Sequence, residues 1–188
     1  MSNIVFNEEG KAVLIDMGCA ATPSTANIAI APLPTKIGTL DFLSPQRLLM
    51  TGAEKGVNTH DELTKEDVYQ LAQTIIDSFS SGNGQKTGTT FTETFGIMLP
   101  RSPWGVQLNE TNIRTLANLD TQQIRDALVS KNLVPHGAGR EDMLNLLTRM
   151  LSNNPSERPS MQEVAEKLTR IAARTDTPVA TAVPESWV

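Results

Sequence analysis

The feature that most constrains the fold of this chain is an apolar stripe between residues 65 and 79. Apolar side chains recur there at spacings of three and four residues, at Val68, Leu71, Ala72, Ile75, Ile76 and Phe79. This period predicts a helix over residues 65–79 with a broad apolar face. Asp67 would lie in its first turn, where a carboxylate suits the helix dipole. A side of the stripe left open to water would be a poor state for a soluble monomer.

Similar patterns predict further helices along the chain. They cover residues 46–50, 111–119, 121–131 and 141–151, and another helix begins at residue 161. Asp120 is placed to cap the helix that starts at residue 121. Ser160, followed three residues later by Glu163, has the capping-box pattern. The chain therefore belongs to the mainly α class, with the short β-hairpin described next at its N-terminus.

Two apolar runs near the N-terminus, Ser2–Phe6 and Lys11–Ile15, flank the turn Asn7–Gly10. Apolar runs joined by a short turn that closes on glycine predict a β-hairpin. A hairpin brings its open ends together, which here carry Asn3 and Asp16. A carboxamide and a carboxylate offer the hard oxygen ligands that Mg²⁺ prefers, so this end is a candidate metal site.

Polar stretches rich in small residues, glycine or proline are predicted to be loops, at residues 19–36, 51–64 and 80–94. Residues 173–188 have no apolar period and are predicted to be a disordered tail, which leaves residues 1–172 as one domain. The final Ser186-Trp187-Val188 fits a C-terminal ligand of the PDZ type.

Composition excludes several classes of function. The net charge of -5 argues against nonspecific nucleic-acid binding. The single Cys19 excludes an internal disulfide and a cysteine-rich zinc site, and His136 is predicted to be a surface loop residue. No apolar run approaches the ~18 residues of a membrane span, and the first residues lack the pattern of a signal peptide. A cytoplasmic protein is expected, with delivery to another cell left open.

Three segments resemble protein kinases, in the order in which that family has them. Asn3–Phe6 with Leu14–Gly18 is similar to the end of the catalytic loop and the Asp-Phe-Gly motif, with Met17 in place of Phe. Ile37–Gln46 is similar to Gly-Thr-x-x-Tyr-x-Ala-Pro-Glu. Asn154–Ser160 is similar to Asn-Pro-x-x-Arg-Pro-Ser. The resemblance implies the large, C-terminal lobe of a Ser/Thr kinase, from the catalytic-loop Asn onward.

By this resemblance, Asn3 and Asp16 would hold the Mg²⁺ that bridges the phosphates of ATP. The activation segment and the platform for the protein substrate would include Gly18, Gly38, Thr39 and Leu40. A phosphate added to the loop between Gly18 and Gly38 could order that loop by pairing with cations. The candidate acceptor residues are Thr22, Ser24, Thr25 and Thr35.

The resemblance also implies two structural roles. Asp67 would hold the backbone of the catalytic loop. Arg158 would pair with the residue that ends the activation segment, which is Gln46 here and Glu in the family. A charge-assisted hydrogen bond contributes ~1.5–3 kcal/mol and a neutral one ~0.5–1.5 kcal/mol. With Gln46 in place of Glu, the expected loss of stabilisation is therefore about 1 kcal/mol, and it is smaller if water or another acid assists Arg158. A looser activation segment is expected as a result.

The chain contains no counterpart of the family's small lobe, its ATP-binding Lys or its catalytic Asp. By the resemblance, the catalytic Asp would precede Met1, because the family places it shortly before the Asn that Asn3 matches. No catalytic residue is therefore assigned within these 188 residues. A truncated gene product, or a start assigned to an internal Met at Met1, is expected.

The full-length form would transfer the γ-phosphoryl group of ATP to protein Ser or Thr, whereas this chain alone would be inactive. One alternative is a non-catalytic, pseudokinase-like scaffold that binds a missing lobe or a partner protein. Another is an unrelated helical domain, because a resemblance in fold does not by itself imply a function.

Overall fold

The computed structural model describes residues 4–9, 11–14, 40–49, 60–81, 90–97 and 108–175. The prediction of a mainly α chain is confirmed for these residues. Along the chain the elements are β1 (Ile4–Phe6), β2 (Ala12–Leu14), η2 (Leu40–Phe42), α1 (Pro45–Leu49), α2 (His60–Ser81), η3 (Glu93–Phe95), α3 (Glu110–Ala117), α4 (Thr121–Ser130), α5 (Arg140–Met150), η4 (Pro155–Glu157) and α6 (Met161–Thr175).

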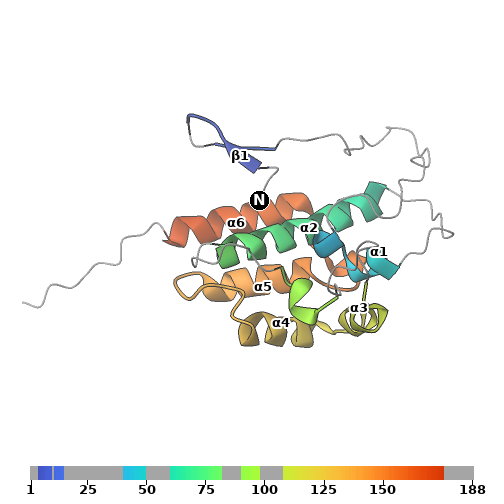
Figure 1. Ribbon diagram of the computed structural model, residues 1–188. Helices are drawn as coiled ribbons and strands as arrows, with labels where there is room; N and C mark the ends of the chain where they lie inside the picture. Colours follow the sequence, from blue (N-terminus) through green and yellow to red (C-terminus); the bar gives the residue numbers. More distant parts are fainter. Residues whose placement is uncertain are drawn as a thin grey trace, which may run out of the picture.

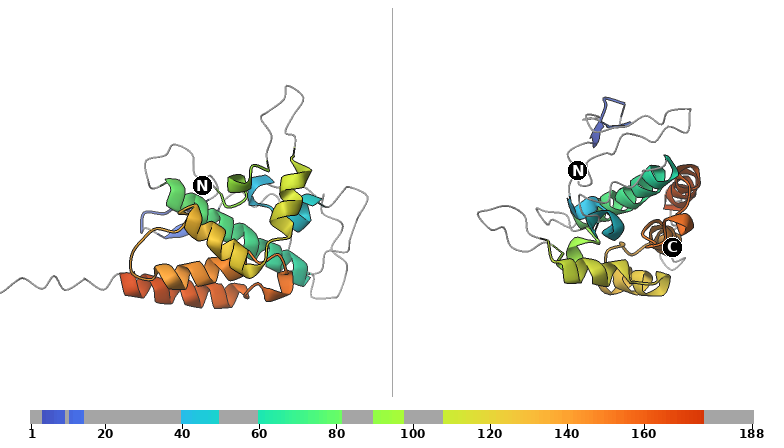
Figure 2. Two further views of the ribbon diagram at one scale, coloured as in Figure 1. Left: turned by 90° about the horizontal axis from the view of Figure 1, so that it is seen from below. Right: turned by 90° about the vertical axis from the view of Figure 1, so that its right-hand side faces the viewer.

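The helices pack in layers around α2 and α5. Helix α5 contacts α2, α4 and α6; in Figure 1, α2 and α6 lie at one level above α5, and α4 lies below α5. The short helices α1 and α3 contact each other at one end of this stack, where η2 meets α2 and η3 meets α3 (Figure 2). Segments from residue 40 to residue 175 therefore meet in one helical body.

The main core forms where the apolar face of α2 meets α5 and α6. Helix α5 buries four large apolar side chains, each of which contributes roughly 1.5–3 kcal/mol when fully removed from water. They are Leu144, Leu146, Leu147 and Met150. A second cluster joins η2 and α1 to α3 through Leu43, Leu48, Ile97 and Ile113. This cluster anchors the segment that follows residue 40 to the rest of the body.

The structure corrects the predicted start of the central helix. Helix α2 begins at His60, five residues before the predicted start, so Asp67 lies two turns into the helix and not in its first turn. The first turn instead carries Asp61 and Glu62, which suit the positive end of the helix dipole. The polar character of residues 60–64 had favoured a loop, but these residues include no glycine or proline to prevent a helix.

The apolar stripe of α2 is covered on one side and partly open on the other. Val68, Ala72 and Ile76 are fully buried, whereas the adjacent row of Leu71, Ile75 and Phe79 is half-buried. The second row is not fully open to water, because the main core also contacts it.

The loop prediction for residues 80–94 is wrong at both described ends. Ser80 and Ser81 complete α2, and η3 begins at Glu93. Thr90, Phe91 and Thr92 do lie in a turn, but they are buried. The buried side chain of Gln73 donates from Nε2 to Thr92 Oγ1 at 2.5 Å. A threonine can lie in the core when its hydroxyl is hydrogen-bonded to a buried amide, because neither polar group is then left without a partner.

The predicted caps of the later helices are confirmed, with one difference. Asp120 accepts a hydrogen bond from the Gln123 backbone while the Gln123 side chain accepts one in return, which completes a capping box for α4. Ser160 Oγ accepts from the Glu163 backbone at the start of α6. The Glu163 carboxylate instead pairs with Arg149 of α5 and with Lys167. The first turn of α6 thus also joins two helices.

Helix α6 continues through Thr175, which corrects the predicted tail boundary at residue 173. Arg174 pairs with Asp142 of α5, so the last turn of α6 has a tertiary partner that the local sequence does not reveal. At the other end of the chain, β1 and β2 pair antiparallel with Ile4 opposite Leu14. None of the helices described is long and apolar enough to cross a membrane.

Candidate functional site

The residues predicted to bind metal and nucleotide, Asn3 and Asp16, lie outside the described residues. Met1, which the expected catalytic Asp would precede, also lies outside them, so the expectation about the start of the chain stays a prediction. The same holds for most of the predicted activation segment and for the candidate phosphorylation sites, namely Gly18, Thr22, Ser24, Thr25, Thr35, Gly38 and Thr39.

Four of the predicted site residues are described: Leu40, Gln46, Asp67 and Arg158. The structure brings two of these, Gln46 and Arg158, within hydrogen-bonding distance of each other. The candidate site is therefore built around this pair.

Arg158 is the centre of the candidate site. It follows η4, and its side chain is only 1% exposed. Its Nε donates to Ser152 O at 2.8 Å and its Nη1 to Lys65 O at 3.0 Å. In return, Lys65 Nζ donates to Arg158 O at 2.6 Å. A buried guanidinium is tolerated only where its donors are satisfied, and these bonds join the α5–α6 connection to α2.

Gln46, in α1, provides the third element of the site. Arg158 Nη2 donates to Gln46 Oε1 at 3.4 Å, and Gln46 Nε2 donates to Asn153 O at 2.6 Å. Asn153 in turn donates to the carbonyl oxygens of Leu116 and Leu119 at the end of α3. The amide of Gln46 is therefore used at both ends, as acceptor and as donor.

Two residues that the sequence reasoning did not single out complete the site, and both lie on α2. Glu66 Oε2 is 3.8 Å from Arg158 Nη1, and Glu66 Oε1 accepts from the Ser44 backbone at 2.9 Å. The guanidinium carbon of Arg158 lies 4.9 Å from the centre of the Tyr69 ring, a cation–π contact. The spacing of Glu66 and Tyr69, three residues apart on one helix face, was the available signal.

Glu66 is thus an acid that assists Arg158. Gln46 assists it as well, through the oxygen of its neutral amide. Burial lowers the pKa of Arg158, and the Glu66 carboxylate, followed by Tyr69, opposes that shift. The site contains a cation, a carboxylate and an aromatic ring, but Arg158 and Glu66 satisfy each other and the backbone around them. The arrangement holds three distant segments together.

Titration of Tyr69 offers a direct test of this packing. Burial raises the pKa of Tyr69 from its ordinary value to about 12. Because the folded state disfavours the phenolate, the stability that this group contributes is full below pH ~10 and is lost as pH rises to ~12. We expect the free energy of unfolding to fall by about 2–3 kcal/mol over this interval.

Tyr69 is the only tyrosine, so tyrosinate absorbance in a pH titration reports this residue alone. The control is Tyr69→Phe, whose stability is expected to fall less between the same pH values because the phenol is absent. A phenol that ionises near pH 10 while the protein is still folded would contradict the burial of Tyr69.

The geometry changes the expectation for Gln46. Gln46→Glu strengthens the bond to Arg158 but removes the donor to Asn153 O and adds a second carboxylate beside Glu66. We expect the free energy of unfolding to change by less than about 1 kcal/mol, whereas Gln46→Leu, which loses both bonds, should cost about 1–2 kcal/mol. Urea unfolding measures both, with the exposed Gln122→Glu as control. A gain above about 2 kcal/mol for Gln46→Glu would contradict this account.

Leu40 and Asp41, in η2, begin the described part of the predicted substrate platform. Leu40 is half-buried beside the second core cluster, and Asp41 is 9% exposed. Burial raises the pKa of Asp41, and the Glu93 carboxylate raises it further. Within the described part of the chain, Asp41 Oδ1 has no hydrogen-bond partner. Asp67, by contrast, is exposed on α2 and does have an interaction partner.

His136 is exposed in the turn before α5, as predicted. In the described ranges, from residue 4 to residue 175 with their gaps, no group of three or more His, Cys, Asp or Glu side chains is placed to hold a metal ion. Comparison with known protein families found no family model that matches the chain, and comparison with curated proteins found no match.

Proposed function

We propose that this chain is the large lobe of a Ser/Thr protein kinase, within a protein that transfers the γ-phosphoryl group of ATP to a Ser or Thr hydroxyl. The observation that carries the proposal is the bond between Arg158 and Gln46, two residues separated by 112 positions. Each belongs to a segment that resembles a kinase motif, and the resemblance implies this pairing. Burial of Arg158 against α2 supports the same arrangement.

In this proposal Asn3 and Asp16 would hold Mg²⁺, an ion that would supply positive charge beside the phosphates of ATP. A carboxamide and a carboxylate are suitable donors for that ion. The segment from Gly38 to Leu40 positions the acceptor hydroxyl of a protein substrate. The proton-accepting Asp and the phosphate-positioning Lys have no counterpart in these 188 residues, so the proposal assigns them to protein outside this sequence.

The test starts with the native protein isolated from its source. Its intact mass is measured, and it is incubated with radiolabelled ATP, Mg²⁺ and a pool of Ser- and Thr-containing peptides. We expect a mass above 20.4 kDa, or a tightly bound partner, together with phosphate transfer to the peptides. The 188-residue chain alone should transfer none.

Asp16→Asn should abolish transfer because it removes the carboxylate proposed to hold Mg²⁺. The matched control is Asp61→Asn, since Asp61 is an exposed carboxylate in the first turn of α2. Absence of transfer from a native protein of 20.4 kDa without a partner would overturn the proposal and favour a non-catalytic interaction module.

A further inference from the structure

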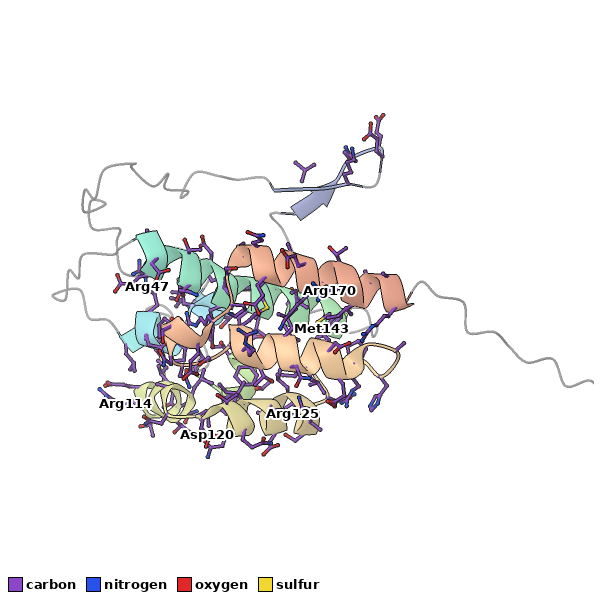
Figure 3. All side chains as sticks on the ribbon, turned by 180° about the vertical axis from the view of Figure 1, so that it is seen from behind. Arg47, Arg114, Asp120, Arg125, Met143 and Arg170 are labelled. Atoms are coloured by element: carbon purple, nitrogen blue, oxygen red, sulfur yellow. The ribbon has the colours of Figure 1, made fainter. Side chains whose placement is uncertain are left out.

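An apolar cavity of about 470 Å³ lies where the end of α2 meets α5 and α6. It is separate from the Arg158 site. Apolar side chains form most of its wall, with Phe79 from α2, Met143 from α5 and Leu168 and Ile171 from α6. Figure 3 shows Met143 between α5 and α6. Its size falls in the range of sites that take a drug-sized ligand, roughly 300–1,000 Å³.

The shape of the cavity depends on Gly139, the residue before α5. Its φ of +80° lies in the left-handed region, and a Cβ added there would meet Ile171 Cγ2 at 3.1 Å. The turn can therefore approach α6 closely on one side. Met143, four residues further on, lies on the same side of α5 and contributes to the wall beside α6.

The ionisable side chains of the wall are an imidazole and a guanidinium, and the guanidinium is a cation. His136 and Arg140 line the cavity, and Arg140 Nε donates to Val134 O at 3.4 Å, which holds the guanidinium there. The two acids that follow in α5 already have partners, because Glu141 pairs with Arg125 and Asp142 with Arg174. An occupant that combines a large apolar group with a carboxylate would fit this wall.

We infer that the occupant is the chain's own segment Pro184–Val188, with the Trp187 indole in the cavity and the Glu185 carboxylate beside His136 and Arg140. This segment combines a large aromatic with an acid two residues earlier. Tryptophan is the side chain with the largest apolar area to bury.

The residues that follow α6 are numerous enough for Trp187 to reach the cavity. The cavity wall includes Ala172, three residues before Thr175, where α6 ends. Eleven residues lie between Thr175 and Trp187, and random-coil statistics give about 20 Å as the average span of a linker of that length. An effective concentration on the order of 1 mM would keep the segment docked most of the time if the free peptide binds with a Kd of about 0.1 mM or tighter.

The first experiment follows Trp187 by fluorescence in the full chain with Trp104→Phe, which leaves Trp187 as the only tryptophan. Compared with an indole exposed to water, a docked indole is expected to emit at shorter wavelength and to be quenched several-fold less by acrylamide. Met143→Glu places a carboxylate in the cavity wall and should restore full quenching. The matched control is Val129→Glu, an exposed apolar residue on α4, which should leave quenching unchanged.

The second experiment needs no substitution in the cavity wall. The chain ending at Val183 is titrated with a labelled synthetic peptide of residues 176–188, and saturable binding with a 1:1 ratio is expected. Absence of binding, or equal quenching of Trp187 in the parent and in Met143→Glu, would overturn the inference. Quenching that depends on protein concentration would overturn the inference and indicate that the segment docks on a second copy of the chain. Binding of the peptide to a PDZ domain, but not to the chain ending at Val183, would overturn it and indicate a PDZ partner.

Discussion

Arg158→Ala is expected to destabilise the protein by about 3–5 kcal/mol, because the change removes one partner of a buried charged network. The side chain contacts Ser152 O, Lys65 O and the Glu66 carboxylate, which would all lose this partner, although Glu66 keeps its bond from the Ser44 backbone. Two carbonyl oxygens and a carboxylate left without it cannot all regain water. For a chain of this size the midpoint of thermal unfolding should fall by about 10 °C.

The matched control is Arg114→Ala on α3. Arg114 pairs with Glu110 one turn earlier, but its side chain is 64% exposed. An exposed pair of this kind contributes only about 0.3–0.5 kcal/mol. Arg158→Lys should lie between the two, since an ammonium group cannot reproduce the planar set of guanidinium donors. If Arg158→Ala cost no more than Arg114→Ala in urea unfolding, the central role of the buried arginine would be wrong.

Phe91→Ala is expected to cost about 3–5 kcal/mol, the usual range for removing a buried phenylalanine. Phe91 is 1% exposed and packs edge-on against Phe95, with ring centres 5.2 Å apart. The measurement is equilibrium unfolding in urea. The cost follows from the cavity that remains, because the threonines on either side are themselves buried.

The control for this change is Phe95→Ala in the same short segment. Phe95 is half-buried, so its removal should cost clearly less than that of Phe91. A cost below about 1 kcal/mol for Phe91→Ala would mean that residues 90–97 behave as the surface loop that composition indicates.

The helices could be predicted from the sequence wherever the apolar period and a cap agree. Helix α4 is the clearest case, since the signals at Asp120 and Gln123 are local and the capping box forms as expected. The start of α2 was missed because residues 60–64 are polar and carry no apolar period. The burial of Thr90 and Thr92 was missed because hydroxyl side chains in a polar stretch are indistinguishable from loop residues until a partner such as Gln73 is known.

At the candidate site, the sequence by itself showed only that Arg158 and Gln46 lie in segments that resemble kinase motifs, with Gln46 where those motifs have an acid. Only the tertiary structure decided that Glu66 and Tyr69 surround Arg158, and that Gln46 also donates to Asn153. The physical reason is range. A cap or an apolar period involves residues a few positions apart, whereas a buried charge is stabilised by groups that only the folded chain brings within hydrogen-bonding distance.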